Sequence, residues 1–533
     1  MNLHRLNEYV MSTIVITIGL VVAVACGKLT ATGEQKLLAT LLVGVTCVAV
    51  ALALRNKIWI LIPLGWQLGG AFPALPVPFR LVDFIVAYVA VTALVLIALR
   101  VYRVRATPLE TVDFVIFIIL ALLLFAFIRN PVGVQAFGSS MVGGRPYFNT
   151  FIGVLAYLIL RSAPVSLRES RSIPFYLLIG AALVSFCTAV GYLLPSVGGT
   201  LAQFYTGFMP PELPGVAATG DGMNRAGGLS VVGETGMLFL NSYCTPITLF
   251  LPVFPFRCLS AGVFSVANLL SGFRTSIATS FAYVIMSSWF RRRFRDMAII
   301  VAVGTVIIGF LSLGIIPLPL SAQRALSFLP GAWRNEAVQD ANDSTQWRID
   351  MWRMVLTEDK WIRNKWFGDG FGFSAYDLSL MQAAEDGGSG IAGGSAQEGF
   401  MIVGAYHSGP LSAIRFVGYI GLAVFYWLLI ILAIKANRLI GRTRGTCLFP
   451  VALFLGMPAI LKPVYFILVF GAFDGDLPTA LFTAGMIRLL ERAVDDYQSA
   501  SGKDRENATP VETMGQPKFR RQFTRPSPAL VNR

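Results

Sequence analysis

Apolar segments of membrane-spanning length recur along this chain, and they constrain its fold more than any other feature. About 20 residues of helix cross the hydrocarbon core of a bilayer. Because lipid offers the backbone no hydrogen-bond partners, a spanning segment satisfies its own polar groups as a helix. We therefore predict an all-α polytopic membrane protein with about 12–14 transmembrane helices. The apolar blocks lie near residues 11–26, 36–53, 57–70, 82–99, 110–128, 148–161, 174–194, 235–256, 258–273, 275–290, 297–317, 412–434, 448–470 and 477–490.

The charged residues are few, and the Lys and Arg residues gather in short loops between the apolar blocks. Hydrophobic residues make up 55% of the chain and charged residues 14%, whereas soluble proteins carry about 25% charged residues. The net charge is +14, but the basic residues form no stripe interleaved with aromatic side chains. This distribution argues against a nucleic-acid partner and favours membrane lipid as the surroundings.

The positions of the basic loops predict the orientation of the chain. With strict alternation of about fourteen spans, the basic clusters and the basic C-terminal tail all fall on one side. Lys and Arg are enriched in cytoplasmic loops, so we expect both termini to be cytoplasmic. The clusters are Arg100, Arg103 and Arg105; Arg161, Arg168 and Arg171; Arg291, Arg292, Arg293 and Arg295; and Lys435, Arg438, Arg442 and Arg444.

This topology divides the chain into four parts. Residues 1–317 form N-terminal transmembrane helices, and residues 318–411 form one large outer loop. Residues 412–492 form C-terminal transmembrane helices, and residues 493–533 form a polar cytoplasmic tail that we expect to be disordered. Two smaller outer loops are expected near residues 129–147 and 195–234.

Within the large outer loop, the stretch QWRIDMWRMVL has the spacing of an amphipathic helix. Arg348, Met351 and Trp352 recur at the required intervals. The Gly- and Ser-rich stretch at 385–399 that follows predicts a mobile loop.

Five ionisable residues lie on the predicted outer face, where the positive-inside rule does not call for arginine. They are Arg225, Arg274, Arg324, Arg348 and His407. Arginine offers a planar set of donors that matches phosphate oxygens in pairs. Histidine, with an ordinary pKa of about 6.5, can take a proton from a hydroxyl group. The simpler alternatives are arginines that reach toward lipid headgroups, a solvated loop helix, and an interfacial histidine.

Three stretches resemble elements of the O-antigen ligase and polysaccharide polymerase superfamily of bacterial membrane glycosyltransferases. They are SGFRTSIA, QWRIDMW with the later WFGDGFG, and HSGPLSAIRFVGYIG. The resemblance covers about residues 225–435. The chain departs from the family pattern at Phe273, where Ser is common, and at Ser408, where Asn is common.

The resemblance implies a fold of the class-C glycosyltransferase kind in the bacterial inner membrane, with the large loop in the periplasm. It implies inverting transfer, without metal or other cofactor, of a glycan from undecaprenyl diphosphate to a hydroxyl of a glycan or lipid A core acceptor. Arg274 and Arg348 match the family's diphosphate-binding arginines, and His407 matches its essential histidine. Arg225 matches an arginine of the earlier outer loop less closely, and Arg324 fits by proximity.

Several alternatives remain open from the sequence. A polymerase, a ligase and a protein O-oligosaccharyltransferase would share the same donor chemistry. A transporter or flippase of a lipid-linked or anionic substrate is a different class, but the chain shows no internal repeat and the candidate functional charges gather at the predicted outer boundary. The FDGD stretch with Asp474 and Asp476 resembles a metal-binding Asp-x-Asp, and we interpret it as a turn.

Overall fold

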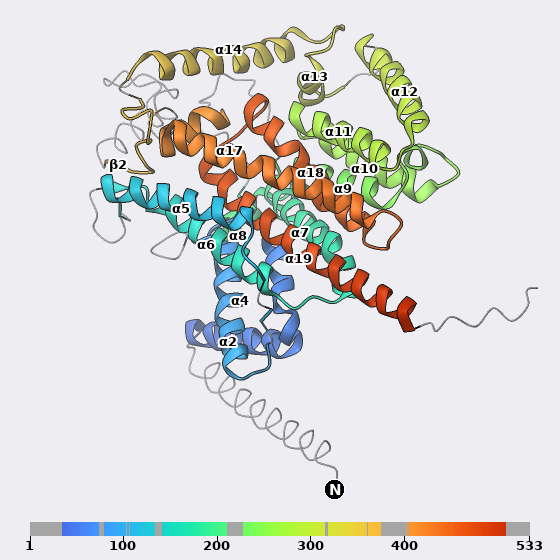
Figure 1. Cartoon of the computed structure of the whole chain (residues 1–533). Coiled ribbons are helices and arrows are strands. Elements are labelled where there is room, and N and C mark those ends of the chain that lie inside the picture. Colours follow the sequence, from blue (N-terminus) through green and yellow to red (C-terminus); the bar gives the residue numbers. More distant parts are fainter. Residues whose placement is uncertain are drawn as a thin grey trace, which may run out of the picture.

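The computed structural model describes residues 35–73, 79–102, 104–105, 107–133, 141–209, 227–314, 318–359, 361–374, 401 and 404–507, and α-helices dominate these residues (Figure 1). Seven of the described helical segments are long and apolar enough to cross a membrane. The chain is therefore an α-helical, multi-pass membrane protein, as predicted. The seven segments are Gly44–Gly65, Leu81–Ala98, Thr111–Arg129, Leu167–Leu193, Phe294–Ser312, Gly409–Thr443 and Phe449–Leu468.

The described elements follow one another in an almost unbroken series of helices. In chain order they are α2 (Gln35–Leu54), η1 (Arg55–Ile60), α3 (Leu61–Gly65), α4 (Leu81–Ala98), α5 (Thr111–Arg129), β1 (Met141–Val142), α6 (Gly144–Ser162), α7 (Leu167–Leu193), α8 (Pro195–Ala202), η3 (Thr206–Phe208), α9 (Gly227–Tyr243), η4 (Pro246–Leu249), α10 (Pro255–Leu270), α11 (Arg274–Phe290), α12 (Phe294–Ser312), α13 (Leu320–Leu326), α14 (Asn335–Thr357), β2 (Phe373–Ser374), α17 (Gly409–Thr443), α18 (Phe449–Leu468) and α19 (Phe473–Asn507).

The core lies where α17, α18 and α19 meet. α17 packs along α18 and α5, and α19 packs along α6. Phe425, Phe466 and Phe473 are fully buried there, one from each of the three helices. The ring centroid of Phe425 lies 5.2 Å from that of Phe466 and 5.1 Å from that of Phe473. Edge-to-face packing of this kind stabilises a core beyond the area it buries.

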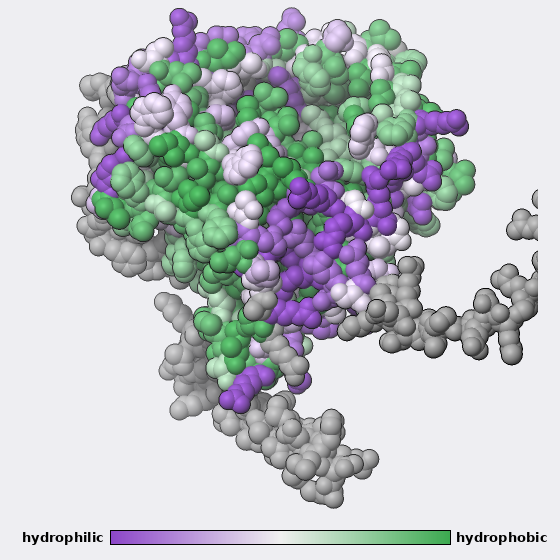
Figure 2. Space-filling model, in the orientation of Figure 1, coloured by the Kyte–Doolittle hydropathy of each residue, from purple (hydrophilic) through white to green (hydrophobic). Residues whose placement is uncertain are grey.

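The outer surface of the helices is apolar. Leu124 on α5 is 58% exposed and Phe310 on α12 is 56% exposed, which is the expected pattern for side chains that face lipid. Figure 2 shows a largely hydrophobic band over α5, α6 and α17. Hydrophilic residues lie above this band over α14 and below it over the C-terminal half of α19.

The helix α17 connects these two hydrophilic margins. It begins beside α14 and carries Lys435 and Arg442 near its other end. The segment Gly409–Thr443, which is kinked at Gly418, is long and apolar enough to cross a membrane. The two ends of α17 therefore belong to opposite faces of the membrane domain.

One predicted apolar block is not a single helix. The block at 235–256 contains the end of α9 at Tyr243, a turn, and then the short helix η4. Pro246 begins η4, and it has no backbone N–H with which to continue the preceding helix. Of the other blocks, 11–26 lies outside the described residues. The helices α6, α9, α10, α11 and α19 are shorter or more polar than the seven spans.

The helix α19 continues past the predicted boundary at residue 493 and ends at Asn507. Ion pairs hold the first part of this extension against the membrane domain. Asp495 lies 2.5 Å from Arg442, and Asp496 lies 2.5 Å from Arg105. Composition alone indicated a disordered tail, because it does not reveal which charges find partners in the fold. Residues 508–533 lie outside the described residues.

Candidate functional site

Three of the predicted site residues come together beside α14. Arg274 begins α11, Arg324 lies in α13 and Arg348 lies in α14. The electrostatic surroundings of Arg274 include repulsion from Arg324 and Arg348 and attraction from Asp340. Arg348 is likewise repelled by Arg324. We refer to Arg274, Arg324 and Arg348 as the arginine cluster.

Arg324 holds the arginine cluster together. It is 5% exposed, and its Nε forms an ion pair with the carboxylate of Asp340 on α14. Its Nη1 donates a hydrogen bond of 3.1 Å to the carbonyl of Gly272, in the turn that precedes α11. Arg324 therefore ties the start of Arg274's helix to the helix of Arg348, so its guanidinium acts in positioning.

The arginine cluster carries a surplus of positive charge. Asp340 is the carboxylate that offsets it, and it is already paired with Arg324. The Nε of Arg348 is buried without a hydrogen-bond partner among the described residues. Burial, followed by repulsion from Arg324, lowers the pKa of Arg348. Arginine nevertheless stays charged at neutral pH, so these side chains suit an anionic ligand.

His407 lies beside α14, next to this cluster. Its ring centroid is 5.6 Å from that of Trp347, the residue before Arg348, and 5.5 Å from that of Phe470 at the end of α18. The indole of Trp352 donates a hydrogen bond of 2.7 Å to the carbonyl of Tyr406. These contacts fix the backbone at His407 against the helix that carries Arg348.

The backbone of His407 is in a sparsely populated conformation. Its φ is +50°, in the left-handed region that few residues other than glycine adopt. Arg55, Arg100 and Arg292 also have positive φ, but each directly follows the end of a helix or a helical turn, where this conformation is common. His407 instead precedes α17. Strain of this kind persists where the surroundings impose it and is concentrated at functional sites.

The amphipathic helix predicted in the large loop is confirmed, and it explains how Arg348 is positioned. Met351 and Val355 on α14 are fully buried, and they pack with Tyr406, Leu411 and Ile414. This apolar face seats α14 over the beginning of α17. Arg348, one turn before Met351 and Trp352, is thereby held near the start of that helix.

α17 is broken at Gly418, where φ is +72° and ψ is −177°. The break frees backbone groups on both sides of it. A turn of the loop before α17, residues 364–370, satisfies them. The N–H of Tyr419 donates to the carbonyl of Lys365 at 2.8 Å, and the N–H of Asp369 donates to the carbonyl of Arg415 at 2.7 Å. The two sequence elements WFGDGFG and GYIG therefore interlock.

Asp369 fixes the shape of this turn. Its carboxylate accepts hydrogen bonds from the backbone N–H groups of Arg363 at 2.9 Å and Asn364 at 3.0 Å. It also forms an ion pair of 2.9 Å with Arg415 on α17. Gly368, with a φ of +70°, brings its backbone against Phe416 so closely that an added Cβ would lie 2.4 Å from a backbone atom. The strand β2 then pairs with β1, which leads into α6.

The sequence analysis overlooked Glu234, a carboxylate within the apolar face of α9. Ser276, two residues after Arg274, hydrogen-bonds to it, and Tyr283 and Tyr465 lie near enough to interact electrostatically. Ionisable residues inside membrane helices are expensive and tend to mark function. Glu234 lies inside α9, whereas the predicted site residues were sought at loop boundaries.

Asp476 and Lys462 form a further polar pair near the same face. Lys462 Nζ lies 2.5 Å from Asp476 Oδ1, and the backbone N–H of Ala472 donates to Asp476 Oδ2 at 3.2 Å. The FDGD stretch is therefore the first turn of α19, where carboxylates are favourable. Among the described residues, no group of three or more His, Cys, Asp or Glu side chains could hold a metal ion.

An apolar groove of about 330 Å³ lies between α9, α10, α11 and α12. On α11 it begins at Ile277, one turn from Arg274, and continues past Phe281 to Val284. Ile300 and Ile307 of α12 line the opposite wall. One end of the groove therefore lies one helical turn from Arg274, and its lining is largely apolar.

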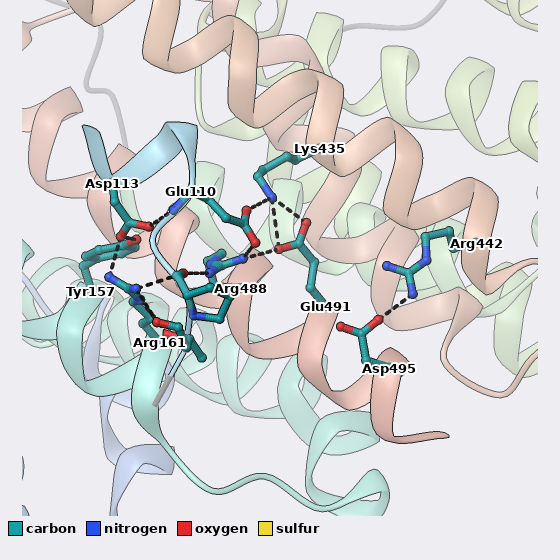
Figure 3. Close-up of polar contacts among 11 residues, drawn as sticks. Glu110, Asp113, Tyr157, Arg161, Lys435, Arg442, Arg488, Glu491 and Asp495 are labelled. Atoms are coloured by element: carbon teal, nitrogen blue, oxygen red, sulfur yellow. Dashed lines mark hydrogen bonds and ion pairs between the residues drawn. The ribbon is translucent and has the colours of Figure 1, made fainter. Parts of the chain in front are cut away.

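A second charged cluster lies at the other end of α17 (Figure 3). Lys435 contacts Glu110 at 2.5 Å and Glu491 at 2.9 Å, and Arg488 forms ion pairs with the same two carboxylates. In this cluster the carboxylates match the cations. We refer to it as the ion-pair network; its members are Glu110, Asp113, Arg161, Lys435, Arg488 and Glu491, with Arg442 and Asp495 beside them.

Arg225, the remaining predicted site residue, lies outside the described residues, as does the Gly- and Ser-rich stretch at 385–399. The structure brings the other four predicted residues to one face of the protein. A scan against protein-family models and a search of curated proteins found no match to this chain.

Proposed function

We propose that this protein is a membrane glycosyltransferase of the bacterial inner membrane. It moves a glycan from undecaprenyl diphosphate to an acceptor hydroxyl at the outer face. The observation that carries the proposal is the arginine cluster, which has surplus positive charge and lies beside a histidine held in a strained backbone conformation. A diphosphate is the anion to which paired arginine donors are best suited.

In this reaction the acceptor oxygen forms a bond to the anomeric carbon, and the bond from that carbon to the phosphate oxygen breaks. Attack from the opposite side inverts the configuration. Arg274 and Arg348 bind the diphosphate and stabilise the negative charge that it gains as it leaves. His407 takes the proton of the acceptor hydroxyl. The arginines supply this charge without a metal or other cofactor, and Arg324 holds both in position.

The apolar groove gives the lipid of the donor a path. The undecaprenyl chain lies along α11 and α12, so that its diphosphate end reaches Arg274.

The acceptor divides the proposal into three branches. A polymerase adds the glycan to another glycan, a ligase adds it to a lipid A core, and a protein O-oligosaccharyltransferase adds it to a protein. The first two are preferred because they are the main branches of the superfamily that the three sequence elements resemble.

Reconstitution tests the proposal. The purified protein is incubated in liposomes with an undecaprenyl-diphosphate glycan, with and without lipid A core, beside His407→Ala. A ladder of longer glycans from donor alone identifies a polymerase, and transfer only with added core identifies a ligase. Loss of transfer in His407→Ala by about 100-fold or more supports the histidine's role. Equal product from wild type and His407→Ala contradicts it.

The broken helix α17 is an observation that favours the transporter alternative, since transporters often place substrates at discontinuous helices. In this protein, however, the turn at 364–370 already occupies the backbone groups on both sides of the break. A flipping assay with fluorescent lipid-linked donor in the same liposomes separates the two. Donor that crosses the bilayer without glycan transfer would replace the enzyme with a flippase.

A further inference from the structure

A basic pocket of about 480 Å³ lies at the membrane face opposite to the arginine cluster. Three turns meet there. They follow the ends of α9, α11 and α17, and they contribute Thr245, the arginines 291–293, and Arg444 with Gly445. We refer to this site as the basic pocket. Its four arginines come from two turns that lie about 150 residues apart in the chain, so the fold, rather than local sequence, creates the concentration of charge.

One arginine of the basic pocket is structural. Arg291 Nη2 donates a hydrogen bond of 2.5 Å to the carbonyl of Ser242, near the end of α9, and its Nε donates to Ser287 Oγ at 3.2 Å. Its guanidinium lies 5.4 Å from the ring centroid of Phe449. Arg291 therefore fixes the floor of the pocket and leaves its charge close to the opening.

The other three arginines are available to a ligand. Arg292, Arg293 and Arg444 are exposed. Arg293 has a loose contact of 3.7 Å with Asp296. Arg292 and Arg444 form no ion pair with the described residues. The ion-pair network at the same face shows the opposite arrangement, since Lys435 and Arg488 there each contact two carboxylates.

The rim of the basic pocket faces lipid. Trp289 and Phe294, which flank the arginine turn, are 59% and 49% exposed, and their ring centroids lie 5.3 Å apart. Tryptophan side chains such as Trp289 are enriched at the level of lipid headgroups. The apolar helix α12 begins at Phe294, and only 6% of the apolar stretch that could span the membrane is buried. A molecule with a phosphate at one end and hydrocarbon chains at the other fits both surfaces.

We propose that the basic pocket binds the headgroup of an anionic phospholipid from the leaflet at that face. The phosphate contacts Arg292, Arg293 and Arg444, and the acyl chains lie along α12. Each basic residue near an anionic lipid strengthens binding about fivefold. The pocket thereby anchors the α11–α12 hairpin, whose other end carries Arg274. The proposal concerns lipid binding alone and does not depend on the proposed glycan transfer.

Native mass spectrometry tests the proposal. The full-length protein in phosphatidylcholine nanodiscs is titrated with phosphatidylglycerol, and retained lipid is counted in the wild type and in the triple variant Arg292→Gln, Arg293→Gln, Arg444→Gln. The matched control is Arg55→Gln, Arg100→Gln, Arg168→Gln. It removes three exposed arginines, and Arg55 and Arg100 share the positive φ of Arg292. We expect the pocket variant to lose roughly 100-fold in affinity and the control less than about threefold.

Three results would overturn the proposal: equal loss in the pocket and control variants, unchanged binding in both, or displacement of the lipid by millimolar inorganic phosphate. The first would mean that only the overall charge of the face attracts lipid. The third would mean that the pocket takes free phosphate. Thermal unfolding of both triple variants in phosphatidylcholine shows whether each remains folded, so that lost binding is not mistaken for lost structure.

Discussion

The arginine cluster and the ion-pair network both gather charge at the margins of a membrane domain, yet they are built in opposite ways. In the network, each of Arg161, Lys435 and Arg488 contacts a carboxylate (Figure 3). In the arginine cluster, one carboxylate, Asp340, is matched with three arginines. Charges that are paired within the protein hold helices together, whereas charges left in surplus are available to a ligand.

The largest expected effect comes from changing the shape of an arginine in the cluster without removing its charge. Arg348→Lys should lower turnover about 100- to 1,000-fold, because lysine cannot offer the planar pair of donors. Arg274→Lys should act similarly. The measurement is single-turnover transfer from the lipid-linked donor in liposomes. Arg353→Lys, an exposed position on the same helix α14, is the control and should retain wild-type turnover. Wild-type rates in both cluster variants would contradict the proposed diphosphate site.

Breaking the ion-pair network should affect stability and leave chemistry intact. Arg488→Met leaves Glu110 and Glu491 with one partner fewer. Arg488 is 7% exposed and Glu110 is 33% exposed. We therefore expect the free energy of unfolding to fall by about 2 kcal/mol, which is less than the cost of breaking a fully buried pair. Thermal unfolding in detergent measures the loss, and the transfer rate per folded molecule should be unchanged. A fall in that rate with normal stability would assign the network a direct role in transfer.

The break in α17 separates the two clusters, and it can be tested with two glycines of the same helix. In Gly418→Ala the added Cβ would lie 2.1 Å from the carbonyl oxygen of Trp366, at a φ of +72°. We expect a destabilisation of about 2 kcal/mol. Gly441→Ala, where an added Cβ meets nothing within 4 Å, should be neutral or slightly stabilising. Chemical unfolding measures the stability of both variants. Equal stability would mean that the turn at 364–370 moves easily to make room for the added methyl group.

The smallest effect is expected at the exposed edge of the network. Arg442 and Asp495 lie 2.5 Å apart, but their side chains are 43% and 59% exposed. Exposed pairs of this kind contribute less than about 1 kcal/mol. Arg442→Gln should therefore shift the unfolding temperature only slightly, and added salt should abolish the difference. A shift as large as that of Arg488→Met would show that the network acts as one unit up to its edge.

The sequence allowed the helices and part of the site to be predicted, for reasons that individual residues make clear. Arg274 and Arg348 stood out because arginine is unexpected on an outer face. The apolar spacing at Met351 and Trp352 predicted the helix that positions Arg348. Such signals depend only on residues that are close in the sequence, so they can be recognised in a single chain. The resemblance to a glycosyltransferase superfamily and the role of His407 remain predictions.

Other features depend on contacts between distant segments and left no local signal. Nothing in the sequence showed that Arg324 would bind Asp340 and Gly272, or that the turn at 364–370 would enter the break at Gly418. Glu234 did carry a signal, since a carboxylate in an apolar helix is unusual. The continuation of α19 beyond residue 493 is contacted by Arg105 and Arg442, which lie far from it in sequence.

The interlock between the turn and α17 has a consequence for the order in which the protein is made. Residues 364–370 leave the ribosome before the helix that receives them, and the proposed topology places the turn beyond the membrane. The outer loop must therefore be translocated before α17 can complete its backbone hydrogen bonds around Gly418. Until then, the carbonyls of Arg415 and Phe416 and the N–H groups that follow Gly418 would face lipid unpaired. On the proposed topology, α17 therefore completes its backbone hydrogen bonds only after the preceding loop has been exported.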